Sequence, residues 1–169
     1  VLFRSITGKE VWQTKVADID KYYSLTIAPR IAGDKVVIGT AGGEYFIRGF
    51  IAAYNVKDGK LAWKFHTVPP APGQPFEDKA QEDAAKTWTG DWAKYGGGGS
   101  VWDGLVYDPD TNLVIAGTGN PEPWPLEMRG AKQSDWGKFT NLYTASIVAV
   151  DANTGKLKWY YQAVPQDIW

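Results

Sequence analysis

The chain has 169 residues, of which 44% are hydrophobic and 22% charged, so it is long enough to bury the core of one domain. Its formal net charge of −1 argues against electrostatic binding of nucleic acid, and it contains no apolar run of about 18 residues that would predict a membrane span. Cysteine is absent, which excludes disulfides, thiolate metal sites and cysteine nucleophiles. The 19 glycines and the 14% of aromatic residues favour a turn-rich all-β fold.

A short motif recurs along the chain as TGKEVW (7–12), DGKLAW (58–63) and TGKLKW (154–159). Trp12 and Trp63 are 51 residues apart and Trp63 and Trp159 are 96 apart, so we interpret DPDTNLV (108–114) as a degenerate copy in the longer gap. A repeat of about 50 residues is typical of a β-propeller with four-stranded blades. The glycine of each copy supplies the positive φ of a tight hairpin, and we expect the tryptophan to pack between blades.

Segments that are apolar or alternate in polarity predict strands at FIAAYNV (50–56), GLVYDP (104–109) and SIVAVDA (146–152). Two long insertions, at 70–99 and 120–138, interrupt the repeat. Within the first, FEDKAQEDAAK (76–86) is rich in helix formers and predicts a short surface helix, after which WTGDWAKYGGGGS (88–100) is predicted to return to the sheet. Long insertions on a repeat scaffold usually gather on one face, where we expect the binding site.

Several common site motifs are only partly matched. GGGGS (96–100) lacks the lysine and the helix of a phosphate loop, and residues 39–49 lack the ordered glycines of a dinucleotide-binding fingerprint. DPDTN (108–112) begins like an EF-hand loop, but the glycine and glutamate required later in that loop are missing. The single histidine, His66, lies in a predicted strand, where a structural role is favoured over catalysis.

The stretch GTAGGEYFIRGF (39–50) places one acid, Glu44, among four glycines. This acid is either a solvated side chain on a hairpin turn or part of a site. In the second interpretation, bare backbone on both sides of Glu44 lets a large, flat ligand come close. The stretch by itself leaves both interpretations open.

Four segments carry a resemblance to a known family: GTAGGEYFIRGFIAAYNVKDGKLAW (39–63), YGGGGSVWDGLVYDP (95–109), GTGNPEPWP (117–125) and NLYTASIVAVDANTGKLKWYYQAVPQDIW (141–169). In this order they resemble the pyrroloquinoline quinone (PQQ)-dependent alcohol dehydrogenases, which include methanol dehydrogenase and the quinohaemoprotein alcohol dehydrogenases. The resemblance begins at Ile6 and implies an internal fragment of an all-β, eight-bladed propeller. Residues 1–169 would form a single incomplete domain of roughly three blades, with short helical insertions in its loops and the cofactor on the propeller axis.

The resemblance also implies roles for individual residues. Glu44 and Asn120 match ligands of a calcium ion, or of a lanthanide in some members, that also contacts PQQ; carboxylate and amide oxygens suit such hard cations. The positions that match cofactor contacts are Thr26, Ala41, Gly42, Gly43, Ser100 and Trp102. Trp102 matches the indole beneath the quinone, although taken alone it would be interpreted as a core residue.

The implied reaction is oxidation of a primary alcohol to an aldehyde, with electrons passed to cytochrome c or another acceptor in the periplasm. The catalytic base is expected to be an Asp directly after Trp169, so we expect no catalytic residue within the chain and no activity from it alone. The adjacent-cysteine pair of the family and any c-type haem domain would lie outside it. Two alternatives stay open: a non-catalytic propeller scaffold and a PQQ-dependent sugar dehydrogenase.

Residues 1–5, VLFRS, are expected to be non-native. The resemblance places a strand end containing Asp before the first Thr-Gly turn, as in VDANTGKLKW (150–159), and VLFRS stands there instead. The same five residues match one reading frame of a common sequencing-adapter end.

Overall fold

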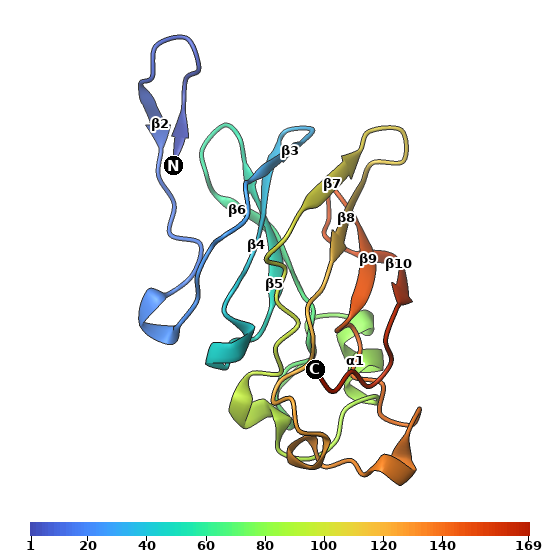
Figure 1. Cartoon of the computed structure of the whole chain (residues 1–169). Helices are drawn as coiled ribbons and strands as arrows, with labels where there is room; N and C mark the ends of the chain where they lie inside the picture. Colours follow the sequence, from blue (N-terminus) through green and yellow to red (C-terminus); the bar gives the residue numbers. More distant parts are fainter.

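The computed structural model describes residues 1–169 as three antiparallel sheets standing side by side (Figure 1). The first sheet is a hairpin of β1 (Leu2–Phe3) and β2 (Glu10–Trp12). The second has four strands in chain order: β3 (Arg30–Ala32), β4 (Lys35–Gly39), β5 (Phe50–Asn55) and β6 (Leu61–His66). The third repeats this order with β7 (Leu105–Asp108), β8 (Leu113–Gly117), β9 (Ser146–Asp151) and β10 (Leu157–Gln162). The predicted all-β propeller architecture is confirmed as two complete four-stranded blades and a hairpin.

Short helices occur only in the connections. They are α1 (Lys79–Ala85) and the 3₁₀ turns η1 (Ile19–Lys21), η2 (Gly43–Tyr45), η3 (Trp92–Tyr95), η4 (Leu126–Arg129) and η5 (Gln133–Asp135). The helix α1 is capped by Asp78, whose side chain accepts a hydrogen bond of 3.0 Å from the backbone N–H of Gln81. Most of these turns and α1 gather at one end of the sheets, at the bottom of Figure 1, close to the C-terminus. None of the helices has the length and apolar composition of a membrane span.

Two of the three motif tryptophans, Trp12 and Trp63, join neighbouring sheets as predicted, whereas Trp159 is 44% exposed. The indole N–H of Trp12 donates to the carbonyl of Val56 at 2.8 Å, and that of Trp63 donates to the carbonyl of Ala152 at 2.8 Å. Each indole lies on the glycine of the next motif, because a Cβ atom at Gly59 or Gly155 would lie 2.6 Å from the ring. At both junctions between neighbouring sheets the repeat therefore encodes a docking contact, in which a tryptophan packs against the backbone of the following turn.

Two expectations about the blades, one on the repeat and one on residues 88–100, were wrong. DPDTNLV (108–114) is the turn between β7 and β8, and it belongs to the same sheet as TGKLKW (154–159), so it is not a degenerate copy of the motif. The wide spacing arises because this blade is preceded and interrupted by long connections. Residues 88–100 also do not return to the sheet, because Gly96 to Gly99 all have positive φ angles, from 63° to 86°, which a β-strand cannot adopt.

The main core lies between the two four-stranded sheets. Its fully buried side chains include Val37, Ile51, Phe65, Val101, Leu105, Val114 and Val148. This packing fixes the strands of both blades relative to each other, so the loops that leave their lower ends begin from a rigid base.

Candidate functional site

A cavity of about 460 Å³ opens at the end of the sheets where the connections gather. Its walls come from the segment before β3, the β4–β5 loop, the segment before β7 and the loop after β8. The lining residues are Ser24, Thr26, Ala41, Gly42, Gly43, Glu44, Ser100, Trp102, Asn120, Glu122 and Trp124. All eight residues singled out from the sequence as cofactor or metal contacts are thus brought together in one cavity.

The loop after β4 carries Glu44 into this cavity. The N–H of Ala41 donates to the carbonyl of Ser24 at 2.9 Å, which holds the start of the loop against the segment before β3. Gly42 has a φ of +103°, and a Cβ atom there would lie 2.6 Å from the carbonyl oxygen of Tyr22. Only glycine fits this position. The chain then turns through η2, which presents the exposed Glu44 side chain beside the bare backbone of Gly43.

The glycine run at 96–99 threads between the two blades. The carbonyl of Gly98 accepts a hydrogen bond of 2.8 Å from the N–H of Gly49, and the N–H of Gly99 donates to the carbonyl of Asn120 at 3.0 Å. A Cβ atom at Gly98 would lie 2.7 Å from that Asn120 carbonyl oxygen, so the two backbone segments touch. The run ends at Ser100, which is buried at the bottom of the cavity.

Trp102 follows on the same segment and remains 58% exposed, so its indole is accessible to a ligand that could stack on it. Its carbonyl accepts a hydrogen bond of 3.2 Å from the hydroxyl of Thr26, a residue of the opposite wall. This bond ties the two walls together next to the indole.

The segment after β8 supplies an amide and a second acid. The side-chain nitrogen of Asn120 donates to Glu122 Oε1 at 3.1 Å and to the carbonyl of Pro121 at 3.3 Å. No hydrogen bond within the chain uses Asn120 Oδ1, so that oxygen is free to accept. Glu122 is only 6% exposed. Burial raises the pKa of Glu122, the charge of Glu44 raises it further, and the hydrogen bond from Asn120 opposes both effects.

The charges of the lining favour a cation. Two carboxylates and one free amide oxygen face the cavity, and no Lys, Arg or His lines it. No group of three His, Cys, Asp or Glu side chains comes together in the structure. The chain by itself therefore offers only part of the coordination shell that a cation would need. A hard cation that takes six to eight oxygens would need further ligands from another molecule or another part of the protein.

The last residues of the chain lie beside the cavity. The ring of Trp169 stacks on Trp124 with their centroids 5.9 Å apart and their planes 6° from parallel. The buried guanidinium of Arg129 donates to the carbonyl oxygens of Trp124, at 3.2 Å, and of Asp167, at 2.5 Å. Burial lowers the pKa of Arg129 to about 10, so the side chain stays charged at neutral pH. Arg129 therefore fixes the C-terminal segment against the wall that carries Trp124.

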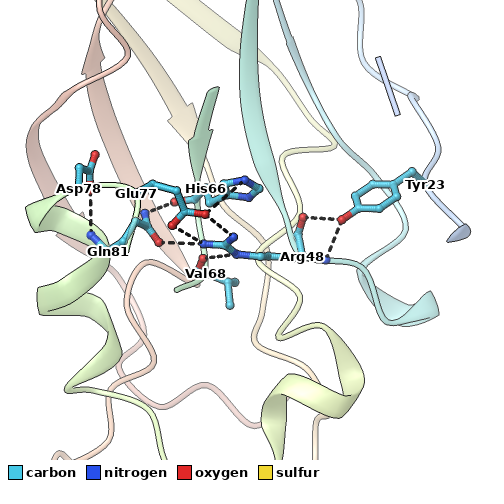
Figure 2. Close-up of polar contacts among 7 residues, drawn as sticks. All are labelled: Tyr23, Arg48, His66, Val68, Glu77, Asp78 and Gln81. Carbon is cyan, nitrogen blue, oxygen red and sulfur yellow. Dashed lines mark hydrogen bonds and ion pairs between the residues drawn. The ribbon is translucent and has the colours of Figure 1, made fainter. Parts of the chain in front are cut away.

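Arg48 braces the β4–β5 loop, which also carries Glu44, against the first insertion (Figure 2). Its guanidinium donates to both carboxylate oxygens of Glu77, at 2.6 and 3.1 Å, and to the carbonyl of Val68 at 2.8 Å. The hydroxyl of Tyr23 bridges the backbone of Arg48, donating to its carbonyl at 3.1 Å and accepting from its N–H at 3.3 Å. The loop that bears the acid is thereby tied to the first insertion.

His66 belongs to this brace and not to the cavity. Its Nε2 lies 3.8 Å from Glu77 Oε1, and Gln81 donates to its backbone carbonyl at 2.6 Å (Figure 2). Burial, and then the charge of Arg48, lower the pKa of His66 to about 4. The ring is neutral at pH 7, which agrees with the structural role favoured from the sequence.

Sequence reasoning missed three lining residues, Ser24, Glu122 and Trp124. Ser24 lies two positions before Thr26, where an extended backbone would place it on the same side. Glu122 and Trp124 alternate with prolines after Asn120 in the segment NPEPWP. A proline at every second position stiffens the backbone. It leaves Asn120, Glu122 and Trp124 as the polar or aromatic side chains of the segment.

Comparison with known proteins places these features in a family. Residues 7–169 match the family described as PQQ: Glucose/ethanol/alcohol dehydrogenase, beta-propeller domain. The chain is 49% identical over 164 residues to quinohemoprotein alcohol dehydrogenase ADH IIB of Pseudomonas putida, covering 96% of this chain and 23% of that protein. It is 46% identical over 167 residues to the quinohemoprotein alcohol dehydrogenase of Comamonas testosteroni, again covering 96% and 23%.

Solved structures agree in backbone as well as sequence. The quinohemoprotein alcohol dehydrogenase ADHIIG of Pseudomonas putida HK5 superposes with a TM-score of 0.89 at 44% identity, covering 99% of this chain and 24% of that chain. A europium-containing methanol dehydrogenase gives a TM-score of 0.82 at 35% identity, covering 99% and 29%. The chain thus spans about a quarter of the length of the proteins it resembles.

Proposed function

Because the chain belongs to the family of PQQ-dependent glucose, ethanol and alcohol dehydrogenase β-propellers, we propose that it is part of a quinoprotein dehydrogenase that oxidises a primary alcohol to an aldehyde. The observation that carries this proposal is the convergence of Glu44, Asn120 and Trp102 on one cavity. A carboxylate, a free amide oxygen and an exposed indole are together what a hard cation beside a flat, conjugated quinone requires.

The cavity wall fits such a cofactor. In this proposal Gly42 and Gly43 let a flat ring approach the backbone, because neither has a side chain to hold it away. Trp102 stacks under the ring, while Thr26 and Ser100 offer hydroxyl groups to its carboxylates. The hydrogen bond from Thr26 to the carbonyl of Trp102 holds these two proposed cofactor contacts at a fixed separation.

Glu44 and Asn120 would hold the metal ion, calcium or a lanthanide, by one carboxylate and one amide oxygen. When bound, the quinone and its metal supply the electron-accepting chemistry of alcohol oxidation. The share of this chain is to bind and orient both groups and to keep water away from them. The base that takes the alcohol proton would be the residue after Trp169, next to the Trp124–Trp169 stack.

The same proposal extends to the surroundings of the whole protein. Electrons would leave to cytochrome c or another acceptor, and a haem c domain elsewhere in the chain is one such route. The periplasm is the compartment that this chemistry implies. Residues 70–99 and 120–138 are proposed as long loop insertions, of which the second lines the cavity through Asn120, Glu122 and Trp124, and residues 1–5 as a non-native start.

The test replaces the charged ligand in the whole protein. Glu44→Gln exchanges an anionic oxygen for a neutral one and should weaken calcium binding by at least about 10-fold, which calorimetric titration of the metal-free protein measures. The exposed Glu127, which lies outside the cavity, provides the matched control as Glu127→Gln. Unchanged metal affinity in Glu44→Gln would remove Glu44 from the site.

Substrate oxidation separates the alternatives. A scaffold would bind neither PQQ nor the metal, whereas a sugar dehydrogenase would bind both but reduce its acceptor with aldoses and not with primary alcohols. Acceptor reduction by a series of alcohols and aldoses therefore decides among the three functions.

A further inference from the structure

One acid of the cavity, Glu122, has no role in the proposal above. It is 6% exposed, and its backbone N–H donates to the carbonyl of Gly97 at 3.0 Å. Its side chain passes directly over Gly98, where a Cβ atom would lie 2.8 Å from Glu122 Cγ. The carboxylate is therefore held in place by its own backbone and by a position where only glycine leaves room for it.

This placement brings the carboxylate into contact with the side chains of Asn120 and Trp124, and the contact with Asn120 bears on the metal. A side-chain amide can point either its oxygen or its NH₂ group at a given partner, and only the oxygen can bind a cation. Glu122 Oε1 takes a hydrogen bond of 3.1 Å from Asn120 Nδ2, and the carbonyl of Pro121 takes a second at 3.3 Å. The carbonyl of Pro121 can only accept, and Glu122 Oε1 accepts in the observed contact, so both favour the orientation with nitrogen toward them. The rotated amide would set oxygen against two oxygens and aim its NH₂ group at the cation.

We propose that Glu122 is a positioning residue that fixes the Asn120 amide with Oδ1 available to the metal. This inference rests on the proposed metal role of Glu44 and Asn120. Partners that orient a ligand in this way typically contribute 10- to 100-fold to metal affinity. A direct role for Glu122, as a ligand or as a negative charge near the metal, is the competing explanation that the experiment must separate.

The experiment uses the whole protein without metal and titrates it with Ca²⁺ and with Tb³⁺, each alone. Calorimetry gives the dissociation constants, and terbium luminescence excited through the indoles of the cavity reports binding at this site. Glu122→Ala removes the acceptor and should weaken binding by about 10- to 100-fold. Glu122→Gln keeps an acceptor oxygen and should bind at least about 10-fold more tightly than Glu122→Ala. Glu127→Ala, an exposed acid, is the control and should match the original protein.

A second variant tests whether Glu122 acts through the amide. In an Asn120→Ala background the amide is gone, so adding Glu122→Ala should weaken binding less than about 3-fold further. The full loss in this background would identify a direct effect on the cation and overturn the proposal. Equal losses in Glu122→Gln and Glu122→Ala, or no loss in either, would overturn it as well. This comparison also works if Glu122→Ala alone is poorly folded, because Asn120→Ala with Glu122→Gln serves the same purpose.

The two proposals fail in different ways. If the original protein binds neither ion, or if Glu44→Gln binds as well as it does, the metal site itself is wrong and both proposals fall. If Glu44→Gln loses affinity while Glu122→Ala does not, only the role of Glu122 is refuted.

Discussion

The contact between blades can be tested at one glycine. Gly155 lies in the β9–β10 turn with a φ of +70°, and the indole of Trp63 from the preceding sheet rests on it. A Cβ atom at Gly155 would lie 2.6 Å from Trp63 Cδ2 and Cε3, which is inside any tolerable contact distance. Trp63 cannot retreat freely, because it is 7% exposed and its N–H donates to the carbonyl of Ala152 at 2.8 Å. Gly155→Ala should therefore disturb the joint between the two blades.

The expected destabilisation by Gly155→Ala has two parts. An alanine in a left-handed conformation costs roughly 1–2 kcal/mol whatever surrounds it. Overpacking against a fixed neighbour adds about 1–3 kcal/mol, so Gly155→Ala should destabilise the protein by about 2–5 kcal/mol. Gly73 separates the two parts, because it has a φ of +86° but a Cβ atom there would meet no other atom within 4 Å. Gly73→Ala should therefore cost only about 1–2 kcal/mol.

The assay is thermal and chemical unfolding of the whole protein with both variants side by side. Large proteins seldom unfold in two states, so midpoints and unfolding rates are compared instead of extrapolated free energies. Gly155→Ala should lower the midpoint more than Gly73→Ala. In a Trp63→Leu background, Gly155→Ala should lower the midpoint by less than it does in the original protein, because the indole that its Cβ atom meets is gone. Equal shifts for the two glycine variants would show that the indole does not press on Gly155, and the docking account would be wrong.

Two further predictions concern His66 and the residue after Trp169. Because burial and the charge of Arg48 lower the pKa of His66 from 6.5 to about 4, the unfolded state binds more protons between these values. Stability should fall as the pH drops through this window, by up to about 3 kcal/mol, and His66→Gln should remove that part of the pH dependence in urea midpoints; an unchanged profile would contradict it. The gene of the whole protein should encode Asp directly after Trp169, because the stack on Trp124 brings this position to the cavity. Sequencing decides the point, and a residue other than Asp or Glu would favour the scaffold alternative.

The blades could be predicted from the sequence because one interaction specifies them locally. A tryptophan at a fixed offset from a turn glycine encodes both the hairpin and the surface that the next blade covers, as Trp63 and Gly155 illustrate. The spacing of the copies was misjudged, because sequence distance does not distinguish a missing repeat from a long loop. DPDTNLV (108–114) has the composition of any hairpin turn, and only strand pairing places it between β7 and β8.

The prediction that residues 88–100 return to the sheet was wrong for a different reason. Their aromatic and glycine content suits a strand edge, but four successive glycines allow positive φ angles that no local rule would assign. The conformation is selected by contact, since the glycine run must pass between the backbones of Gly49 and Asn120. Information of this kind lies in the packing of two loops, and neither loop carries it alone.

The cavity also contains residues that could be predicted from the sequence and one whose role could not. Glu44, Asn120 and Trp102 could be named because a resemblance attached roles to them, whereas no such role was attached to Glu122, and the role proposed for it acts through a neighbour. Its significance depends on a hydrogen bond of 3.1 Å to Asn120 and on the missing side chain at Gly98, and these are facts about distances in space. A ligand can be recognised from its chemistry, but the residue that orients it is recognisable only once the geometry is known. If Glu122 holds the Asn120 amide, the proposed metal site depends as much on the oxygen that accepts this hydrogen bond as on the proposed ligands.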